Sequence, residues 1–374
     1  MKAKFFLPLL ALLATVVACT GTPDQTGGEG EIIDGKINLI IDHQFIRANG
    51  KEAVNFTVLV QDASGMFQNV TSDAQIYAEG NSTPLAEPKF TSESSGEWTF
   101  YALYGLEVSN EVNVKAVAGI ADIPADPAPE STDFHHRIML LQHTGTACPN
   151  CPGMMTILKN LAEDAAYADR YNHVASHSYS YDPSYPDAAH SADADELSRH
   201  LAVMFYPWLT YNLTEVTDYE LSDIKARIDQ LQKATADVGI SLSASEADGA
   251  VYANVAVKAA KSGKYRMAVW LLEDGIFAKQ AGKVASWQET HNNALRAMVG
   301  ETKTERIYGK SIGTIEAGKT YENLVAINEL DAEWVVSACE VMVLITAEDA
   351  NGNYDVVNTA VCKVGESYAY EYNK

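Results

Sequence analysis

A Cys-Pro-Asn-Cys motif placed between a buried strand and a helix constrains the fold of this chain more than any other feature. Residues 138–141 form a short continuous apolar run, which is typical of a strand buried on both faces. Apolar residues then recur at helical spacing from 154 to 165, and Cys148 and Cys151 lie between the two segments. Strands that alternate with helices through this region predict a mostly parallel sheet covered on both faces.

The motif has the chemistry of a thiol–disulfide couple. The first N–H groups of a helix lack partners and the helix dipole is positive there, so a thiolate is favoured at Cys148. We predict that the helix begins near residue 148, that Cys148 attacks a substrate and that Cys151 resolves the mixed disulfide. His177 falls at the carboxyl end of a predicted strand, where a cationic side chain would stabilise the thiolate.

Tyr206-Pro207 comes 56 residues after Cys151, at the start of an extended segment. A thioredoxin-like fold has a cis-proline at this topological place, facing the two sulfurs. We therefore predict a cis bond that lets the backbone of Tyr206 pair with a substrate strand. The alternative is that Pro207 only ends a helix predicted over residues 192–205, in which case the bond is trans.

Two other interpretations of the cysteine pair stay open at this point. A lone Cys-x-x-Cys can be half of a zinc site that is completed by His135, His136, His143 or His177, although no second paired ligand motif appears at finger spacing. It can also be a static disulfide in an exported protein. The redox interpretation calls for no cofactor.

The amino terminus has the pattern of an export signal. Two lysines precede the apolar run 5–17, which is too short to span a membrane, and Ala18 stands directly before Cys19. This pattern resembles a bacterial lipoprotein box, so we predict removal of residues 1–18, acylation of Cys19 and a flexible tether over 19–30. The residue after Cys19 is Thr rather than Asp, which points to the outer membrane.

Changes in residue pattern divide the rest of the chain. Residues 31–120 and 237–374 show the two-residue alternation of half-buried strands, which predicts an immunoglobulin-like β-sandwich over the first range and a second β-sandwich over the last. A Pro-rich linker over 121–133 precedes a thioredoxin-like α/β domain over 134–236. The expected fold class is therefore multidomain, α/β plus all-β. With 27 Lys and Arg against 50 Asp and Glu, the net charge of −23 argues against nucleic acid as a partner.

A second pair of cysteines lies near the carboxyl terminus. Cys339 and Cys362 flank a turn centred on residues 349–352 and would lie opposite each other in an ideal hairpin. Opposed cysteines can be bridged in an oxidising compartment, or they can be two buried apolar side chains. We favour the bridge.

Three motifs together carry a resemblance to a known family. They are Thr144-Gly145-x-x-Cys148-x-Asn150-Cys151-Pro152, Tyr206-Pro207 and His291-Asn292-x-x-Leu295-Arg296. Over about residues 130–365 the chain resembles the twenty-eight-kilodalton outer-membrane protein family of Bacteroides-type bacteria, lipoproteins with a thioredoxin-like domain and immunoglobulin-like flanks. The resemblance implies attachment to the outer membrane, at its periplasmic face or at the cell surface, and no established reaction.

The chain departs from this pattern in two places. Leu141 and Gln142 stand where acidic residues are expected, and the segment after Pro207 leaves little room for the last hairpin of a thioredoxin sheet. Gln142 cannot titrate, so a redox site here needs another base. The resulting hypothesis is a lipid-anchored redox protein that acts on protein or peptide thiols and disulfides. The rival hypothesis is a surface binding or adhesion module in which Cys148–Cys151 is static.

Overall fold

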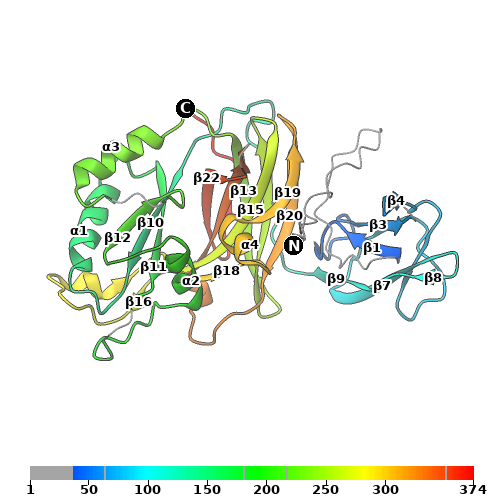
Figure 1. Cartoon of the computed structure of the whole chain (residues 1–374), viewed down its shortest axis with the longest axis horizontal. Helices are drawn as coiled ribbons and strands as arrows, with labels where there is room; N and C mark the ends of the chain where they lie inside the picture. Colours follow the sequence, from blue (N-terminus) through cyan, green and yellow to red (C-terminus); the bar gives the residue numbers. More distant parts are fainter. Residues whose placement is uncertain (1–36, 63–64, 180–181, 215–217, 350–351) are drawn as a thin grey trace, which may run out of the picture.

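The long axis of the molecule runs from an N-terminal β module to a helical end. The computed structural model describes residues 37–62, 65–179, 182–214, 218–349 and 352–374. Figure 1 shows the β module at one end, helices α1 (Cys151–Ala162) and α3 (Leu221–Leu231) at the other, and two large sheets between them. Cys19 and the predicted signal peptide and tether lie outside the described residues.

The N-terminal module consists of two β-sheets packed face to face. One sheet has the order β1-β3-β4, with β6 beside β3, and the other has the order β2-β9-β7-β5, with β8 beside β7. The strands are β1 Ile37–Ile41, β2 Phe45–Arg47, β3 Val54–Gln61, β4 Phe67–Asn69, β5 Gln75–Ala78, β6 Lys89–Phe90, β7 Gly96–Tyr104, β8 Glu107–Val108 and β9 Val112–Val117. Alternate side chains of both sheets bury one apolar core, in which the rings of Phe56 and Phe100 lie 4.8 Å apart.

The Pro-rich segment 121–133 is fastened to the body by a buried cation. The side chain of Lys258 is 6% exposed, and its Nζ donates to Asp126 at 3.0 Å and to the carbonyl of Pro129 at 2.5 Å. Asp126 also accepts a hydrogen bond from the hydroxyl of Tyr372 at 2.7 Å. The linker is therefore a strap that is fixed along the body of the chain.

Replacing the buried cation should loosen this strap. Lys258→Met is expected to lower the free energy of unfolding by about 1–3 kcal/mol, because it leaves a partly buried carboxylate with one hydrogen-bond donor fewer. Limited proteolysis should then cut within residues 121–133 faster than in the parent protein. Lys89→Met is the control, since Lys89 and its partner Glu87 are 53% and 63% exposed and such pairs contribute under about 1 kcal/mol. Unchanged cleavage in Lys258→Met would count against the strap.

An eight-stranded sheet runs through the remainder of the chain in the order β12-β10-β11-β18-β15-β21-β22, with β19 beside β15. The strands are β10 Ile138–Thr144, β11 Tyr171–His177, β12 Trp208–Tyr211, β15 Gly263–Glu273, β18 Ala294–Met298, β19 Lys310–Ile315, β21 Cys339–Glu348 and β22 Tyr354–Lys363. β10 pairs parallel with β11 and antiparallel with β12, while β11 joins β18 through Ala175 and Ala294. The predicted boundary between 134–236 and 237–374 therefore cuts through one continuous sheet.

Other elements cover both faces of this sheet. A four-stranded sheet of order β20-β14-β13-β23 packs on β15 and β21 through Val255, Val269 and Val343. Its strands are β13 Val238–Ala247, β14 Ala250–Ala259, β20 Thr320–Ile327 and β23 Ser367–Tyr368. Helices α2 (Ala192–His200) and α4 (Lys303–Tyr308) lie on the opposite face around Trp270, and α1 and α3 pack on β10 and β12 around Leu140. The chain is thus a β-rich multidomain protein.

The two cysteines of the C-terminal hairpin are free thiols. The hairpin closes on the pair Glu348 and Tyr354, one residue from the ideal register, and a β-bulge after Ile345 adds a second shift. Cys362 therefore pairs two residues away from Cys339, and the predicted bridge is wrong. Burial raises the pKa of Cys339 to about 12 and that of Cys362 to about 11, so both remain thiols at neutral pH.

Candidate functional site

The Cys-Pro-Asn-Cys segment forms a disulfide at the amino end of α1. Cys148 and Cys151 are bridged, and their Cα atoms lie 5.4 Å apart. The helix begins at Cys151 with Asn150 as its N-cap, three residues later than the sequence predicts. Pro149 accounts for the difference, because a proline disfavours helical geometry at the residue before it. Cys148 lies ahead of the helix, and its N–H donates to the carbonyl of Gly145 at 3.1 Å.

Both halves of the disulfide are nearly enclosed, while the tip of the loop is open. Cys148 is 2% exposed and Cys151 is fully buried, whereas Pro149 and Asn150 between them are exposed. A partner molecule can therefore reach the disulfide only from the side of Cys148.

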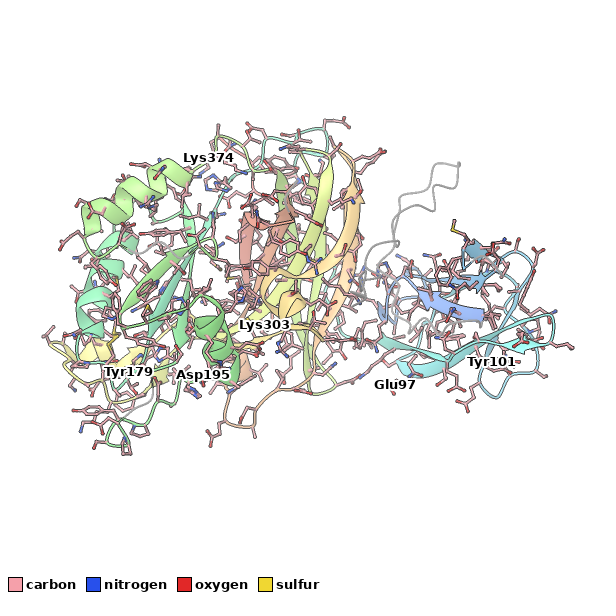
Figure 2. All side chains as sticks on the ribbon, in the orientation of Figure 1. Glu97, Tyr101, Tyr179, Asp195, Lys303 and Lys374 are labelled. Carbon is pink, nitrogen blue, oxygen red and sulfur yellow. A yellow bond between two sulfur atoms is a disulfide. The ribbon has the colours of Figure 1, made fainter. Side chains whose placement is uncertain are left out.

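A cavity of about 700 Å³ opens beside Cys148. Its walls come from the disulfide loop, the segment after β11, helix α2 and the segment before β12. Figure 2 shows two of the lining residues, Tyr179 and Asp195, at the end of the molecule away from the N-terminal module. Met204 and Phe205, which are 84% and 52% exposed, also line this cavity. The approach to Cys148 therefore has an exposed apolar wall.

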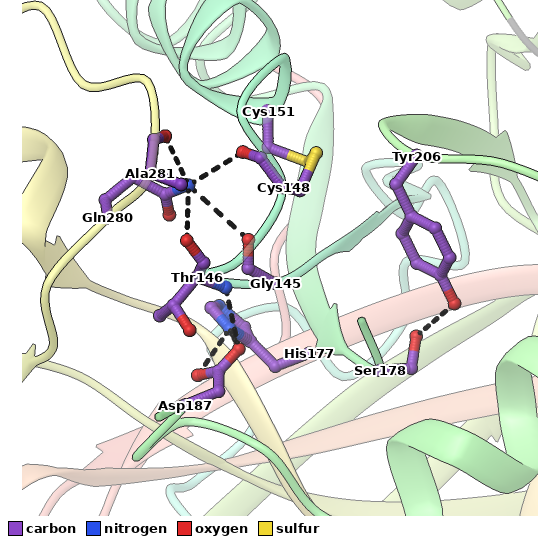
Figure 3. Close-up of a disulfide and its surroundings, with 10 residues drawn as sticks. All are labelled: Gly145, Thr146, Cys148, Cys151, His177, Ser178, Asp187, Tyr206, Gln280 and Ala281. Carbon is purple, nitrogen blue, oxygen red and sulfur yellow. Dashed lines mark hydrogen bonds and ion pairs between the residues drawn. A yellow bond between two sulfur atoms is a disulfide. The ribbon is translucent and has the colours of Figure 1, made fainter. Parts of the chain in front are cut away.

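The bond between Tyr206 and Pro207 is cis, which is the geometry expected from the sequence. Tyr206 lines the cavity beside Cys148, and its hydroxyl lies 2.9 Å from the hydroxyl of Ser178. Ser178 is in turn 2.7 Å from the hydroxyl of Ser198 on α2. In Figure 3 the disulfide lies between Tyr206 on one side and Gln280 on the other. Binding of a substrate backbone at this position stays a prediction.

Gln280, from the C-terminal half of the chain, holds the disulfide loop from within. Its side-chain Nε2 lies 3.0 Å from the carbonyl oxygen of Cys148, 3.2 Å from that of Thr146 and 3.4 Å from that of Gly145 (Figure 3). The next residue, Ala281, donates its N–H to the carbonyl of Thr146 at 2.8 Å. These bonds fix the backbone on which Cys148 sits.

The contact continues along residues 280–288, which we call the clasp. Gly282 has a φ of +68°, and a Cβ there would lie 2.1 Å from the carbonyl oxygen of Pro149. Only glycine combines that conformation with so close an approach. Gln288 donates from Nε2 to the carbonyl of Pro152 at 2.9 Å. The clasp therefore holds the loop both before and after the disulfide.

His177 ends β11 as predicted, but its partner is a carboxylate rather than a sulfur. Its Nδ1 lies 2.9 Å from Asp187 Oδ2, and both side chains are 1% exposed. Asp187 also accepts the N–H of Thr146 at 2.9 Å (Figure 3). Burial alone would raise the pKa of Asp187, but the charge and hydrogen bond of His177, with two backbone N–H groups, hold it below its usual range. His177 thus acts on the loop ahead of Cys148 through Asp187.

The histidines considered as zinc ligands are dispersed. His135, His136 and His143 each hydrogen-bond a different neighbour, and His177 is held by Asp187. Within the part of the chain that the structure describes, no group of three or more His, Cys, Asp or Glu side chains is arranged to hold a metal ion. In the described structure, the cysteine pair and the four candidate histidines are therefore not brought together as one zinc site.

The third sequence motif has a structural role. The ring of His291 lies edge-on to His177 at 4.8 Å, and its Nε2 donates to a backbone carbonyl at 3.3 Å. Arg296 donates from Nε to Glu273 at 2.7 Å, with both side chains under 5% exposed. Sequence reasoning missed Gln280, Asp187 and Glu273, because their partners are set by the tertiary fold and no local pattern marks them.

Residues 206–367 match a family model described as outer membrane protein Omp28. This range starts at the cis bond and includes the clasp and the third motif. The fold and the family match together define the class of this protein, which is a β-rich multidomain protein of the outer membrane. The matched family is the one that the sequence motifs indicate, and the match includes the second and third of them. Among the described residues, no helix combines the length and apolar character that a membrane crossing requires.

A solved structure shares the fold. HBP35 of Porphyromonas gingivalis aligns with a TM-score of 0.51 and 14% sequence identity, over 65% of this chain and 79% of that protein. At this identity the likeness concerns the fold alone. No curated protein matches the chain.

Proposed function

We propose that the protein is an outer-membrane thiol–disulfide oxidoreductase with Cys148–Cys151 as its redox couple. The observation that carries this proposal is the cavity that Cys148 lines together with Tyr206 and the exposed side chains of Met204 and Phe205. Only the Cys148 side of the disulfide meets this cavity, so the two sulfurs are inequivalent, as an attacked and a leaving sulfur must be.

The topology around the disulfide supports a thioredoxin-like arrangement. β10 leads into the disulfide and α1, β11 returns parallel to β10, and β12 lies antiparallel on the other edge of β10. The disulfide and the segment entering β12 then meet at one end of the sheet. The N-terminal sandwich is the immunoglobulin-like flank of this proposal, and Cys19 is its lipid anchor.

The proposed reaction oxidises a dithiol substrate. A substrate thiolate attacks the sulfur of Cys148, which forms a mixed disulfide and releases Cys151 as a thiolate that takes up a proton. The second substrate thiol loses its proton and attacks the mixed disulfide, so the substrate leaves as a disulfide and Cys148 leaves as a thiolate, which is then protonated. Two electrons pass from the substrate to the protein. The apolar wall of Met204 and Phe205 suits an unfolded protein or peptide as the substrate.

Titration with thiol–disulfide buffers of known potential tests this proposal. We expect a reduction potential above about −300 mV for the Cys148–Cys151 couple. The structural disulfides of secreted proteins have reduction potentials below that value. Cys151→Ser, in which Cys148 is a free thiol, should trap a mixed disulfide between Cys148 and a peptide supplied as its disulfide, and Cys148→Ser should abolish oxidation of the same peptide supplied as its dithiol. Cys339→Ser is the control and should leave the potential unchanged. A potential below −300 mV with no trapped adduct would refute the redox proposal.

The clasp favours a second candidate function. It holds the carbonyls of Cys148 and Pro152 on either side of the disulfide, as a static staple in a surface-binding module would require. If the disulfide is a static staple, reducing it should lower the free energy of unfolding. The buffer titration should then give a reduction potential below about −300 mV, as for other structural disulfides. The same titration therefore decides between the two functions.

Attachment through Cys19 has its own test. Cys19→Ser is expected to release the protein from the outer membrane and to leave the leader uncleaved, because this residue supplies both the processing site and the lipid anchor. Membrane fractionation and the mass of the mature chain measure both effects. A processed Cys19→Ser protein that stays with the membrane would remove the lipoprotein assignment.

A further inference from the structure

A second cavity, of about 720 Å³, lies between α1, the strands β10 and β11 and residues 287–293. It is at the end of the molecule that carries α1 in Figure 1. Among the described lining residues, none is shared with the cavity beside Cys148. We call it the α1 cavity. It plays no part in the disulfide chemistry proposed above.

Much of the wall of the α1 cavity is apolar. Met155, Leu158 and Ala162 of α1 line one side, with Trp287 and Val361 also in the lining. A cavity of a few hundred Å³ with such walls and a few polar groups is the usual form of a small-molecule site. The walls therefore suit a ligand with an apolar body.

Two hydrogen-bond donors inside the α1 cavity have no partner. Gln142 is 3% exposed, and its buried Nε2 makes no hydrogen bond within the described structure. The same holds for the buried Nε2 of His173, whose Nδ1 lies 3.1 Å from the side-chain Nδ2 of Asn293. With Nδ1 as the acceptor from this amide, the ring hydrogen sits on Nε2. Both donors lack the acceptor that buried polar groups normally have.

The two donors lie close enough to serve one ligand. β10 and β11 pair in parallel with Leu140 opposite His173 and Gln142 opposite Ala175, so Gln142 and His173 are diagonal neighbours on one face. Pairing a buried donor recovers free energy that is lost while the donor stays unpaired. A single oxygen-bearing group placed between them would gain from both.

The charge of the lining favours a neutral ligand. Burial, with a smaller effect from His177, lowers the pKa of His173 to about 4, so this ring is uncharged at neutral pH. Glu340 also lines the cavity, and the cationic Lys159 is 44% exposed and paired with Glu163. The buried His177 also lines the cavity, but its charge is already paired with Asp187. A carboxylate in the interior would therefore have no unpaired buried cation among the described lining residues. A neutral carbonyl oxygen needs no cation and can be bound by the two hydrogen-bond donors alone.

We propose that the α1 cavity binds a small neutral molecule that has an apolar body and a carbonyl oxygen, with the oxygen accepting hydrogen bonds from Gln142 and His173. The apolar body lies along Leu158 and Trp287. This site is separate from the disulfide and stands whether or not the disulfide is redox active.

Methyl NMR of the full mature chain with 2-octanone as the probe tests the proposal. The Met155 methyl signal, assigned through Met155→Leu, should shift saturably as the ketone is added. Gln142→Met keeps the side-chain shape without the donor and should weaken binding by roughly tenfold. His173→Phe should do the same. Lys89→Met, at an exposed ion pair of the N-terminal module, is the control and should leave ketone binding unchanged.

Two further arms keep the test decisive. Leu158→Trp fills the cavity from α1 and should abolish binding without touching a polar group, which covers the case in which a Gln142 or His173 variant fails to fold. Octanoate, with the same chain length and a charge, should bind more weakly than the ketone. Tighter binding of octanoate would overturn the neutral class. No saturable shift of Met155, or equal affinity in Gln142→Met, would overturn the site.

Discussion

Arg296→Met is expected to lower the free energy of unfolding by about 3–5 kcal/mol, the cost of removing one partner from a buried ion pair. Arg296 and Glu273 have side chains 4% and 3% exposed, and Nε lies 2.7 Å from the carboxylate. The other carboxylate oxygen of Glu273 accepts the N–H of Val335 at 2.9 Å. Without Arg296 this carboxylate would stay buried with a single donor. Urea unfolding curves measure the loss.

A matched surface pair gives the control. Arg170 and Asp229 form an ion pair with side chains 33% and 52% exposed, so Arg170→Met should cost under about 1 kcal/mol. The double variant Arg296→Met, Glu273→Leu should recover part of the loss, because no charge then remains buried. Equal effects of Arg296→Met and Arg170→Met would show that the buried pair is not a special determinant of stability.

Stability should fall steeply as the pH drops from 6.5 towards 4. Burial lowers the pKa values of His136, His143, His173 and His291 to about 4, 3, 4 and 4. These folded-state values lie below the unfolded value of about 6.5, so the unfolded chain binds more protons in this window. Stability is therefore complete above pH 6.5 and is lost as the pH falls. Four such groups give a slope of up to about 5 kcal/mol per pH unit.

Urea unfolding midpoints between pH 7.5 and 4.5 measure this slope. His143→Phe removes one of the four histidines that take up a proton on unfolding and should reduce the slope by about a quarter. His190→Gln is the control, because this side chain is 34% exposed. Constant stability from pH 7 to pH 5 would contradict the burial of neutral histidines.

The order strand, disulfide, helix could be predicted because it depends on neighbouring residues. The apolar run 138–141 and the helical spacing from 154 to 165 record local burial directly. The joining of β11 to β18 could not be predicted, because Ala175 and Ala294 lie far apart in the chain and each strand pattern is compatible with several partners. For that reason the sequence did not show that strands on both sides of residue 237 belong to one sheet.

The candidate site divides in the same way. Cys148, Cys151 and Pro207 could be recognised from spacing, whereas the contact of His177 depends on Asp187 in an irregular segment. A β-bulge likewise leaves little trace in residue alternation, so the register of Cys339 was predicted two residues away from its actual position. Local patterns identified the two cysteines and the proline, and tertiary contacts set what each of them touches.

The clasp has a consequence for how the protein is made. Gln280 and Gly282 follow Cys148 by well over a hundred residues, so they leave the export channel long after the cysteines do. Until they arrive, the disulfide loop lacks its inner support and both thiols are open to the oxidants of the envelope. In the folded protein the bond is therefore enclosed by residues that come from the C-terminal half of the chain, and its loop depends on them for support.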